Sequence, residues 1–124
     1  MNREMLENVF VTALEGGSNY WYALSGTARA KVRKGVPRAE DPYFATAMLT
    51  AVLDHGVEID IHDGENPEDV LGTLSANTME KRLKDLRESP HYRYAIEAEE
   101  DGDGDAETSD IVFQYLVIGE VWFS

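Results

Sequence analysis

Apolar residues recur at three- and four-residue spacing in four segments of the chain, and this spacing predicts helices that bury one face. The segments cover about 2–14, 41–55 and 77–90, and the fourth begins near Ala106. The fourth is apolar on nearly every side, which is typical of a helix in the middle of a core. Residues 120–123 then end the sequence as a short strand or a docked tail.

The expected ends of these helices carry capping residues. A double glycine at 16–17 ends the first helix, and an Asp-Pro pair at 41–42 suits the start of the second. Asn77 and Glu80 resemble a capping box for the third helix. Asp105 fits as the N-cap of the last.

Other segments alternate apolar and polar residues, which is the period of a half-buried strand. They are 19–24, 27–35 and 57–62, and 70–74 follows a turn-rich stretch as the expected hairpin partner of the third. The pattern predicts an α+β fold, with about four helices packed on a small, mainly antiparallel sheet of three or four strands. We expect a single globular domain over 1–124.

The segment EGGSNYW at 15–21 places a polar pair and several aromatic residues directly after a helix end. As the start of a strand it would point Tyr20 and Tyr22 inward and Trp21 to the opposite face. As the lip of a pocket, the glycines would let a ligand approach the backbone, with Asn19 and Trp21 contacting it. The sequence leaves both interpretations open.

Composition narrows the class of protein. The 124 residues include no cysteine, which excludes disulfides, thiol catalysis and cysteine metal sites. No apolar run approaches the roughly 18 residues of a membrane span, so we expect a cytoplasmic protein that does not bind membranes. No phosphate-binding glycine loop or nucleophile motif is present, so the sequence predicts no cofactor and no enzyme activity.

Charge is unevenly distributed along the chain. The net charge is −13, and the eight acids between Glu97 and Asp110 account for most of it, because −13 + 8 leaves −5. We expect a flexible acidic loop at about 97–107, and no direct binding to nucleic acid because the long-range field repels phosphates. Five of the eleven basic residues lie between Arg29 and Arg38, which leaves room for a local anion site.

The basic residues would form one outer face of the 27–35 strand. Arg29, Lys31 and Arg33 alternate with small apolar residues there and are candidates to hold phosphate groups. Aromatic residues near the double glycine, Tyr20 and Trp21, are candidates to grip a base or another flat group.

Two further polar positions are site candidates. His62 ends a strand beside Asp63, but neighbouring strand residues point to opposite faces, and Asp63 also suits the first position of a turn, so no metal site is predicted. Gln114, next to Tyr115, is the polar interruption of the last helix. A buried amide without partners costs about 1–3 kcal/mol, so Gln114 must bond to backbone or to a ligand.

Three blocks of this sequence, in order, resemble a family of short bacteriophage and prophage proteins of unassigned function. The blocks are TALEGGSNYW at 12–21, IHD at 61–63 and DAETSDIVFQYLVIGEVWF at 105–123. The chain departs from the family pattern at Ile118, where the family has an aromatic residue, and in its basic cluster. The resemblance implies a phage or prophage context, in which small proteins often act in host takeover or counter-defence.

Three functional hypotheses follow. In the first, the protein is a non-catalytic binder that sequesters a nucleotide-derived, phosphate-bearing host defence signal. In the second, the acidic segment mimics DNA charge and occupies a host protein. In the third, which we favour least, His62 and Asp63 support a metal-assisted enzyme. A homo-oligomer is compatible with the first hypothesis, but no heptad pattern requires it.

Overall fold

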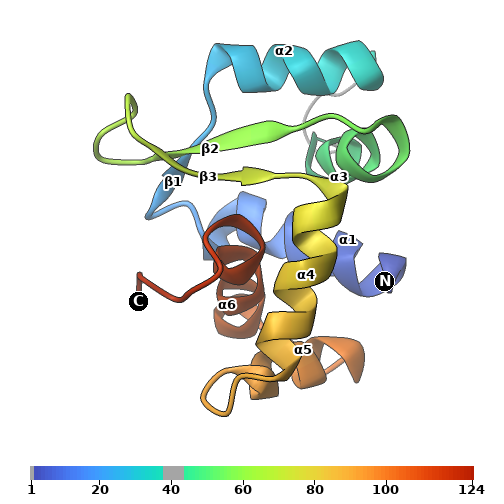
Figure 1. Ribbon diagram of the computed structural model, residues 1–124, viewed down its shortest axis with the longest axis vertical. Coiled ribbons are helices and arrows are strands. Elements are labelled where there is room, and N and C mark those ends of the chain that lie inside the picture. The colour runs from blue at the N-terminus through green and yellow to red at the C-terminus, as the bar shows by residue number, and fades with distance from the viewer. Residues whose placement is uncertain (1, 38–43) are drawn as a thin grey trace.

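The computed structural model describes residues 2–37 and 44–124, in which helices pack on both sides of a small sheet (Figure 1). The helices are α1 (Arg3–Thr12), the π-helical η1 (Ala13–Gly17), α2 (Gly26–Gly35), α3 (Phe44–His55), α4 (Ala76–Arg87), α5 (Arg93–Glu100) and α6 (Ala106–Val117). The strands are β1 (Tyr22–Ala23), β2 (Ile59–Asp63) and β3 (Val70–Leu74). The α+β class is confirmed, although the described residues form six α-helices rather than about four.

The sheet has the order β1-β2-β3, and both pairs are antiparallel. The predicted hairpin is confirmed, because β2 pairs with β3 and Ile59 lies opposite Leu74. Ile59 and Ile61 are fully buried, as their alternation predicted, while Asp60 between them is exposed. In Figure 1 the sheet lies between α2 on one side and the ends of α4 and α6 on the other.

The core is centred on α6, which contacts α1, α4, α5 and β3. Val112, Phe113 and Leu116 have no exposed surface, and the ring of Phe113 meets that of Phe10 edge to face at 5.6 Å. Burying one such side chain contributes about 1.5–3 kcal/mol. The prediction that the last helix is central to the core is therefore confirmed.

The predicted strand at 27–35 is wrong, because this segment is helix α2. Ala28 and Val32 fit the two-residue period of a strand and, because they are four residues apart, also the 3.6-residue period of a helix. They are the buried positions of α2. Ser25 sets the start, since its Oγ accepts a hydrogen bond of 3.0 Å from the Ala28 N–H. Gly26 is the first residue of α2.

The segment 19–24 is also mostly not a strand. The Trp21 N–H donates to the Ser18 carbonyl at 3.1 Å, so the chain turns after η1, and only Tyr22–Ala23 pairs with β2. The expected inward set is corrected: Trp21 is 2% exposed, whereas Tyr20 is 49% exposed.

The boundaries of the later helices differ from the prediction in two places. The N-cap of α4 is Ser75, two residues before the expected cap Asn77, so the helix begins at Ala76. The expected acidic loop at 97–107 is reduced to 101–105, because α5 continues to Glu100. Asp105 is confirmed as the N-cap of α6, where it forms a capping box with Thr108. The predicted cap at 41–42 lies outside the described residues.

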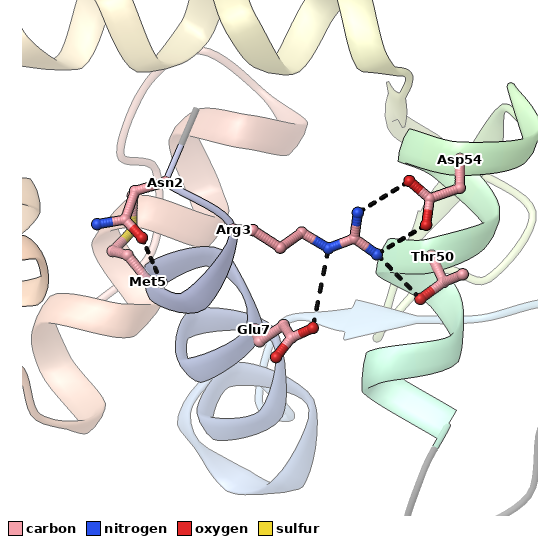
Figure 2. A network of polar contacts seen from close by, with 6 residues as sticks. All are labelled: Asn2, Arg3, Met5, Glu7, Thr50 and Asp54. Atoms are coloured by element: carbon pink, nitrogen blue, oxygen red, sulfur yellow. Dashed lines mark hydrogen bonds and ion pairs between the residues drawn. The ribbon is translucent and has the colours of Figure 1, made fainter.

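Arg3 joins α1 to α3 at the surface (Figure 2). Its terminal nitrogens donate to the two carboxylate oxygens of Asp54 at 2.9 and 3.0 Å and to the Thr50 hydroxyl at 3.2 Å. Its Nε lies 3.8 Å from the Glu7 carboxylate, an ion pair too long to be a hydrogen bond. The hydrogen bond from Arg3 lowers the pKa of Asp54 below its ordinary value. Exposed pairs of this kind orient helices more than they stabilise them.

Candidate functional site

A concavity that we call the tyrosine pocket lies where the end of η1 meets the starts of α5 and α6. It has a volume of about 580 Å³ and takes in the C-terminal tail, residues 121–124. Its lining residues are Gly16, Gly17, Tyr20, Tyr92, Tyr94, Ala106, Glu107, Asp110, Ile111, Val121, Phe123 and Ser124. Four separate segments of the chain therefore build one cavity.

The wall of the tyrosine pocket is organised by Asp110, a buried carboxylate on α6 that is 8% exposed. Its Oδ1 accepts hydrogen bonds from the Ser18 hydroxyl at 2.7 Å and from the Trp21 indole N–H at 2.8 Å. Its Oδ2 accepts from the Tyr20 hydroxyl and from the Gln114 amide at 3.2 Å. Four donors thus satisfy one carboxylate, as a buried charge requires.

Gln114 fixes the tail that closes one side of the pocket. Its Oε1 accepts from the backbone N–H groups of Trp122 and Phe123 at 2.8 and 2.9 Å. Its Nε2 donates to the Phe123 carbonyl at 3.0 Å. The Phe123 ring then stacks on Trp21, with centroids 5.3 Å apart and planes 6° apart. Of the predicted alternatives, Gln114 bonds to backbone, and residues 120–123 are a docked tail rather than a strand.

Two of the three tyrosines that line the pocket are exposed. Tyr20 and Tyr94 are 49% and 47% exposed, two of the four large hydrophobic side chains that the described residues leave exposed. Tyr92 is half-buried, and its ring packs against Tyr115 at 6.1 Å. Burial, and then the hydrogen bond to Asp110, raise the pKa of Tyr20, so its hydroxyl stays protonated. Burial and the nearby Glu107 also raise the pKa of Tyr94.

Of the predicted site residues around this pocket, one lines the cavity and three lie behind its wall. Tyr20 lines the tyrosine pocket. Trp21 does not form its lip, because its ring is buried in the core behind the wall and its N–H is bonded to Asp110. Tyr115 lies behind Tyr92, and Gln114 is buried with both ends of its amide used.

Four of the remaining predicted residues lie around two smaller concavities. Asn19 and Arg29 line one of about 280 Å³, in which the Arg29 guanidinium lies 5.1 Å from the centre of the Phe44 ring. Lys31 and His62 line another of about 270 Å³. The structure therefore does not gather the predicted set at one site.

The basic face predicted for Arg29, Lys31 and Arg33 is corrected together with the strand. On a helix of 3.6 residues per turn, Arg29 and Arg33 share a side of α2, while Lys31 points away from them. Lys31 instead reaches the backbone carbonyl of Glu58, with its Nζ at 3.4 Å.

His62 and Asp63 serve the turn between β2 and β3. The Asp63 carboxylate accepts the Glu65 N–H at 2.8 Å, as its predicted role as a turn residue requires. The His62 Nδ1 donates to the Pro67 carbonyl at 2.6 Å. In the part of the chain that the structure describes, no three His, Cys, Asp or Glu side chains are grouped so that they could hold a metal ion.

The acidic segment also contains a structural acid that the sequence pattern concealed. Glu99 is 8% exposed and accepts hydrogen bonds from the Thr108 and Ser109 hydroxyls at 2.8 and 2.6 Å. A Cβ on Gly104 would lie 2.3 Å from the Glu99 carboxylate, so only glycine fits there without displacement. Glu99 therefore ties α5 to the start of α6 and is not part of a solvated charge surface.

Most residues of the tyrosine pocket were not predicted as site residues, among them Tyr92, Tyr94, Glu107 and Asp110. Their segments gave an ambiguous pattern at 92–98 and a run of acids before the last helix. The available signal was two tyrosines separated by one residue, which as a strand would face the same way but here begin helix α5.

Comparison with known proteins adds no relative. No protein-family model matches the chain, and no significant match is found among the curated proteins or the solved structures. Within the described residues, no helix is both long enough and apolar enough to span a membrane.

Proposed function

We propose that the protein binds a small organic ligand in the tyrosine pocket and holds it without chemical conversion. The observation that carries the proposal is the pocket itself: about 580 Å³, with three tyrosines at its surface and a wall fixed by the hydrogen bonds of Asp110. Small-molecule sites are typically concavities of about 300–1,000 Å³ with apolar and aromatic walls and a few placed polar groups.

The rigidity of the wall supports binding. A cavity whose side chains are already held in place loses little conformational freedom when a ligand enters. The tail supplies Phe123, which is held by Gln114 and stacked on Trp21, so this side of the pocket is also fixed.

The state of Asp110 supports binding over catalysis. A general base needs an oxygen that can reach the proton of a substrate. Both oxygens of Asp110 already accept two hydrogen bonds each, and the Tyr20 hydroxyl is directed at one of them. These groups stabilise the wall, and the tyrosine rings provide the contact surface.

Sequestration is the biological form that we propose for this binding, in line with the phage context that the sequence blocks imply. The phosphate-bearing signal expected from the sequence stays a prediction, and it concerns a second, smaller concavity rather than the tyrosine pocket. Asn19 and Arg29 both line that concavity, which supports binding of a phosphate group there. Glu15 lines it as well, and its carboxylate would repel an anion.

Thermal unfolding with a panel of nucleotides, organic cations and neutral aromatic compounds tests the proposal. A ligand at 100 times its Kd adds about 2.7 kcal/mol to the free energy of unfolding, a rise in Tm of several degrees for a domain of this size. Ala106→Phe would fill the tyrosine pocket from an exposed helix position, and Ala30→Phe is the matched control on α2, also exposed and outside this pocket.

The expected result is a ligand-induced shift that Ala106→Phe abolishes and Ala30→Phe retains. A shift that survives Ala106→Phe would locate binding elsewhere and refute the proposed site. If no compound shifts the Tm of the well-folded protein, the small-ligand proposal fails, and the acidic surface becomes the feature to test against protein partners.

A further inference from the structure

The lining of the tyrosine pocket has a single sign of charge. Glu107 and Asp110 contribute carboxylates, and none of the described residues that line it is Lys, Arg or His. The protein as a whole carries −13, which raises the local concentration of cations near its surface. A ligand with exposed phosphates would meet repulsion in this pocket and no compensating cation.

The positive end of α6 does not reverse this preference. The start of a helix favours anions because its first N–H groups are unpaired. Here the Asp105 carboxylate already accepts the Thr108 N–H at 2.9 Å, and Glu107 adds a second acid in the first turn. The protein's own acids therefore occupy the place that a bound anion would take.

The tyrosines provide the complementary surface for a cation. An ammonium group over the face of an aromatic ring is attracted by the ring quadrupole, and several rings with a nearby carboxylate form the usual site for alkylated ammonium groups. Tyr20, Tyr92 and Tyr94 line the pocket together with Glu107. Burial, and then the hydrogen bond to Asp110, raise the pKa of Tyr20 and keep it neutral, and the side chain is 49% exposed and so accessible for this contact.

From this arrangement we infer that the ligand of the tyrosine pocket is an organic cation, a small molecule with a quaternary or otherwise alkylated ammonium group. The inference rests on the proposed function and adds the charge and chemical class of the ligand. The ammonium group contacts the rings of the tyrosines and lies near the Glu107 carboxylate. The apolar residues Ile111 and Phe123 contact the rest of the molecule.

A pair of probes that differ only in charge tests the inference. Choline and 3,3-dimethylbutan-1-ol have nearly the same shape, but the quaternary nitrogen of the first is a neutral carbon in the second. Titration followed by NMR of the tyrosine ring protons gives Kd and location together. Choline is expected to bind at least about tenfold more tightly than the neutral compound.

Variants separate pocket binding from general attraction of cations. Tyr94→Leu removes a ring face without changing any charge at neutral pH and is expected to weaken choline binding about tenfold, while Tyr94→Phe keeps the face and changes it by less than about twofold. Glu107→Gln is expected to weaken choline binding about threefold. Glu97→Gln removes the same charge from an exposed position outside the pocket and is the matched control.

The outcomes distinguish this inference from the proposal on which it rests. Equal binding of choline and 3,3-dimethylbutan-1-ol would overturn the cation inference and leave the pocket as a binding site. The same holds if only uncharged or anionic members of the panel bind and Ala106→Phe blocks them. If neither probe nor any panel compound binds, both the inference and the proposed function fail. Equal weakening by Glu107→Gln and Glu97→Gln would reduce the effect to long-range attraction and overturn the assigned contact.

Discussion

Replacing Asp110 with asparagine is the most direct test of the network that builds the pocket wall. Asparagine has the same shape, but one oxygen becomes an NH₂ group that can only donate. If the amide oxygen stays between Ser18 and Trp21, its NH₂ faces the amide of Gln114, which also donates. If the side chain is flipped, the NH₂ faces the indole N–H of Trp21. Either orientation leaves a buried donor without an acceptor.

The expected cost follows from these contacts. One buried donor without a partner costs about 1–3 kcal/mol, and hydrogen bonds to the remaining oxygen fall from the charged value of about 1.5–3 kcal/mol to the neutral value of about 0.5–1.5 kcal/mol. Removing a buried charge offsets part of this loss. We expect Asp110→Asn to lower the free energy of unfolding by about 2–4 kcal/mol, out of a total of about 5–15 kcal/mol for a domain.

Equilibrium unfolding in urea is the assay, followed by far-UV circular dichroism and by tryptophan fluorescence. Trp21 is buried against the mutated residue, and the second tryptophan, Trp122, lies in the tail that Gln114 holds, so tryptophan fluorescence reports on the region around the pocket, whereas circular dichroism reports on the whole fold. Two-state behaviour requires that both signals give the same midpoint. The change in midpoint at constant m-value then gives the change in stability.

Asp105→Asn on the same helix is the matched control. Asp105 caps α6 by accepting the Thr108 N–H, and asparagine is an equally good N-cap, so only a helix-dipole contribution of about 0.3–1 kcal/mol is lost. The reasoning predicts a clear difference between two identical chemical changes five residues apart. If Asp110→Asn were no more destabilising than Asp105→Asn, the four hydrogen bonds would not be an important part of the fold.

Two further predictions concern packing and pH. Gly72→Ala should lower the free energy of unfolding by about 3 kcal/mol or more, because the new Cβ would lie 1.9 Å from the Val117 carbonyl oxygen. Urea unfolding measures this change, and a loss below about 1 kcal/mol would show that the end of α6 is not packed tightly against β3. Burial raises the pKa of Tyr22 to about 12 from 10.0, with a smaller opposing effect of Arg29, so its contribution to stability is complete below about pH 10 and is lost as pH rises toward about 12. Between about pH 10 and pH 12, the free energy of unfolding should therefore fall less for Tyr22→Phe than for the unmodified chain. An equal fall in both proteins would contradict the raised pKa of Tyr22.

Local patterns predicted the parts of the fold whose signals do not depend on distant partners. The helical spacing of α1 and α6, the alternation of β2 and the acid that caps α6 all follow from neighbours within a few residues. The strand predicted for the segment TARAKVRKG is wrong because Ala28 and Val32 are compatible with both a strand and a helix. The serine that caps this helix, Ser25, was the local signal that decided between them.

The candidate site was harder to predict because its contacts are distant in sequence. Ser18 and Asp110 are 92 residues apart, and no spacing rule connects them. The polar and aromatic residues of EGGSNYW were recognised as unusual, but the sequence could not show that their partner was a carboxylate of the protein rather than a ligand. Tyr92 and Tyr94 reach the same cavity only because α5 packs beside α6.

Two of the sequence blocks, the first at 12–21 and the last at 105–123, have a common physical role in the structure. Trp21 and Tyr20 from the first block and Asp110 and Gln114 from the last form one hydrogen-bonded unit, which fixes the turn after η1 and the C-terminal tail around the pocket. The polar atoms of these residues bond to one another and to the tail, so these residues hold the walls of the pocket in place. Glu107 and the exposed rings of Tyr20 and Tyr94 also line the pocket, so under the proposed function substitutions at Tyr94 should change ligand preference, while substitutions at Asp110 should change stability.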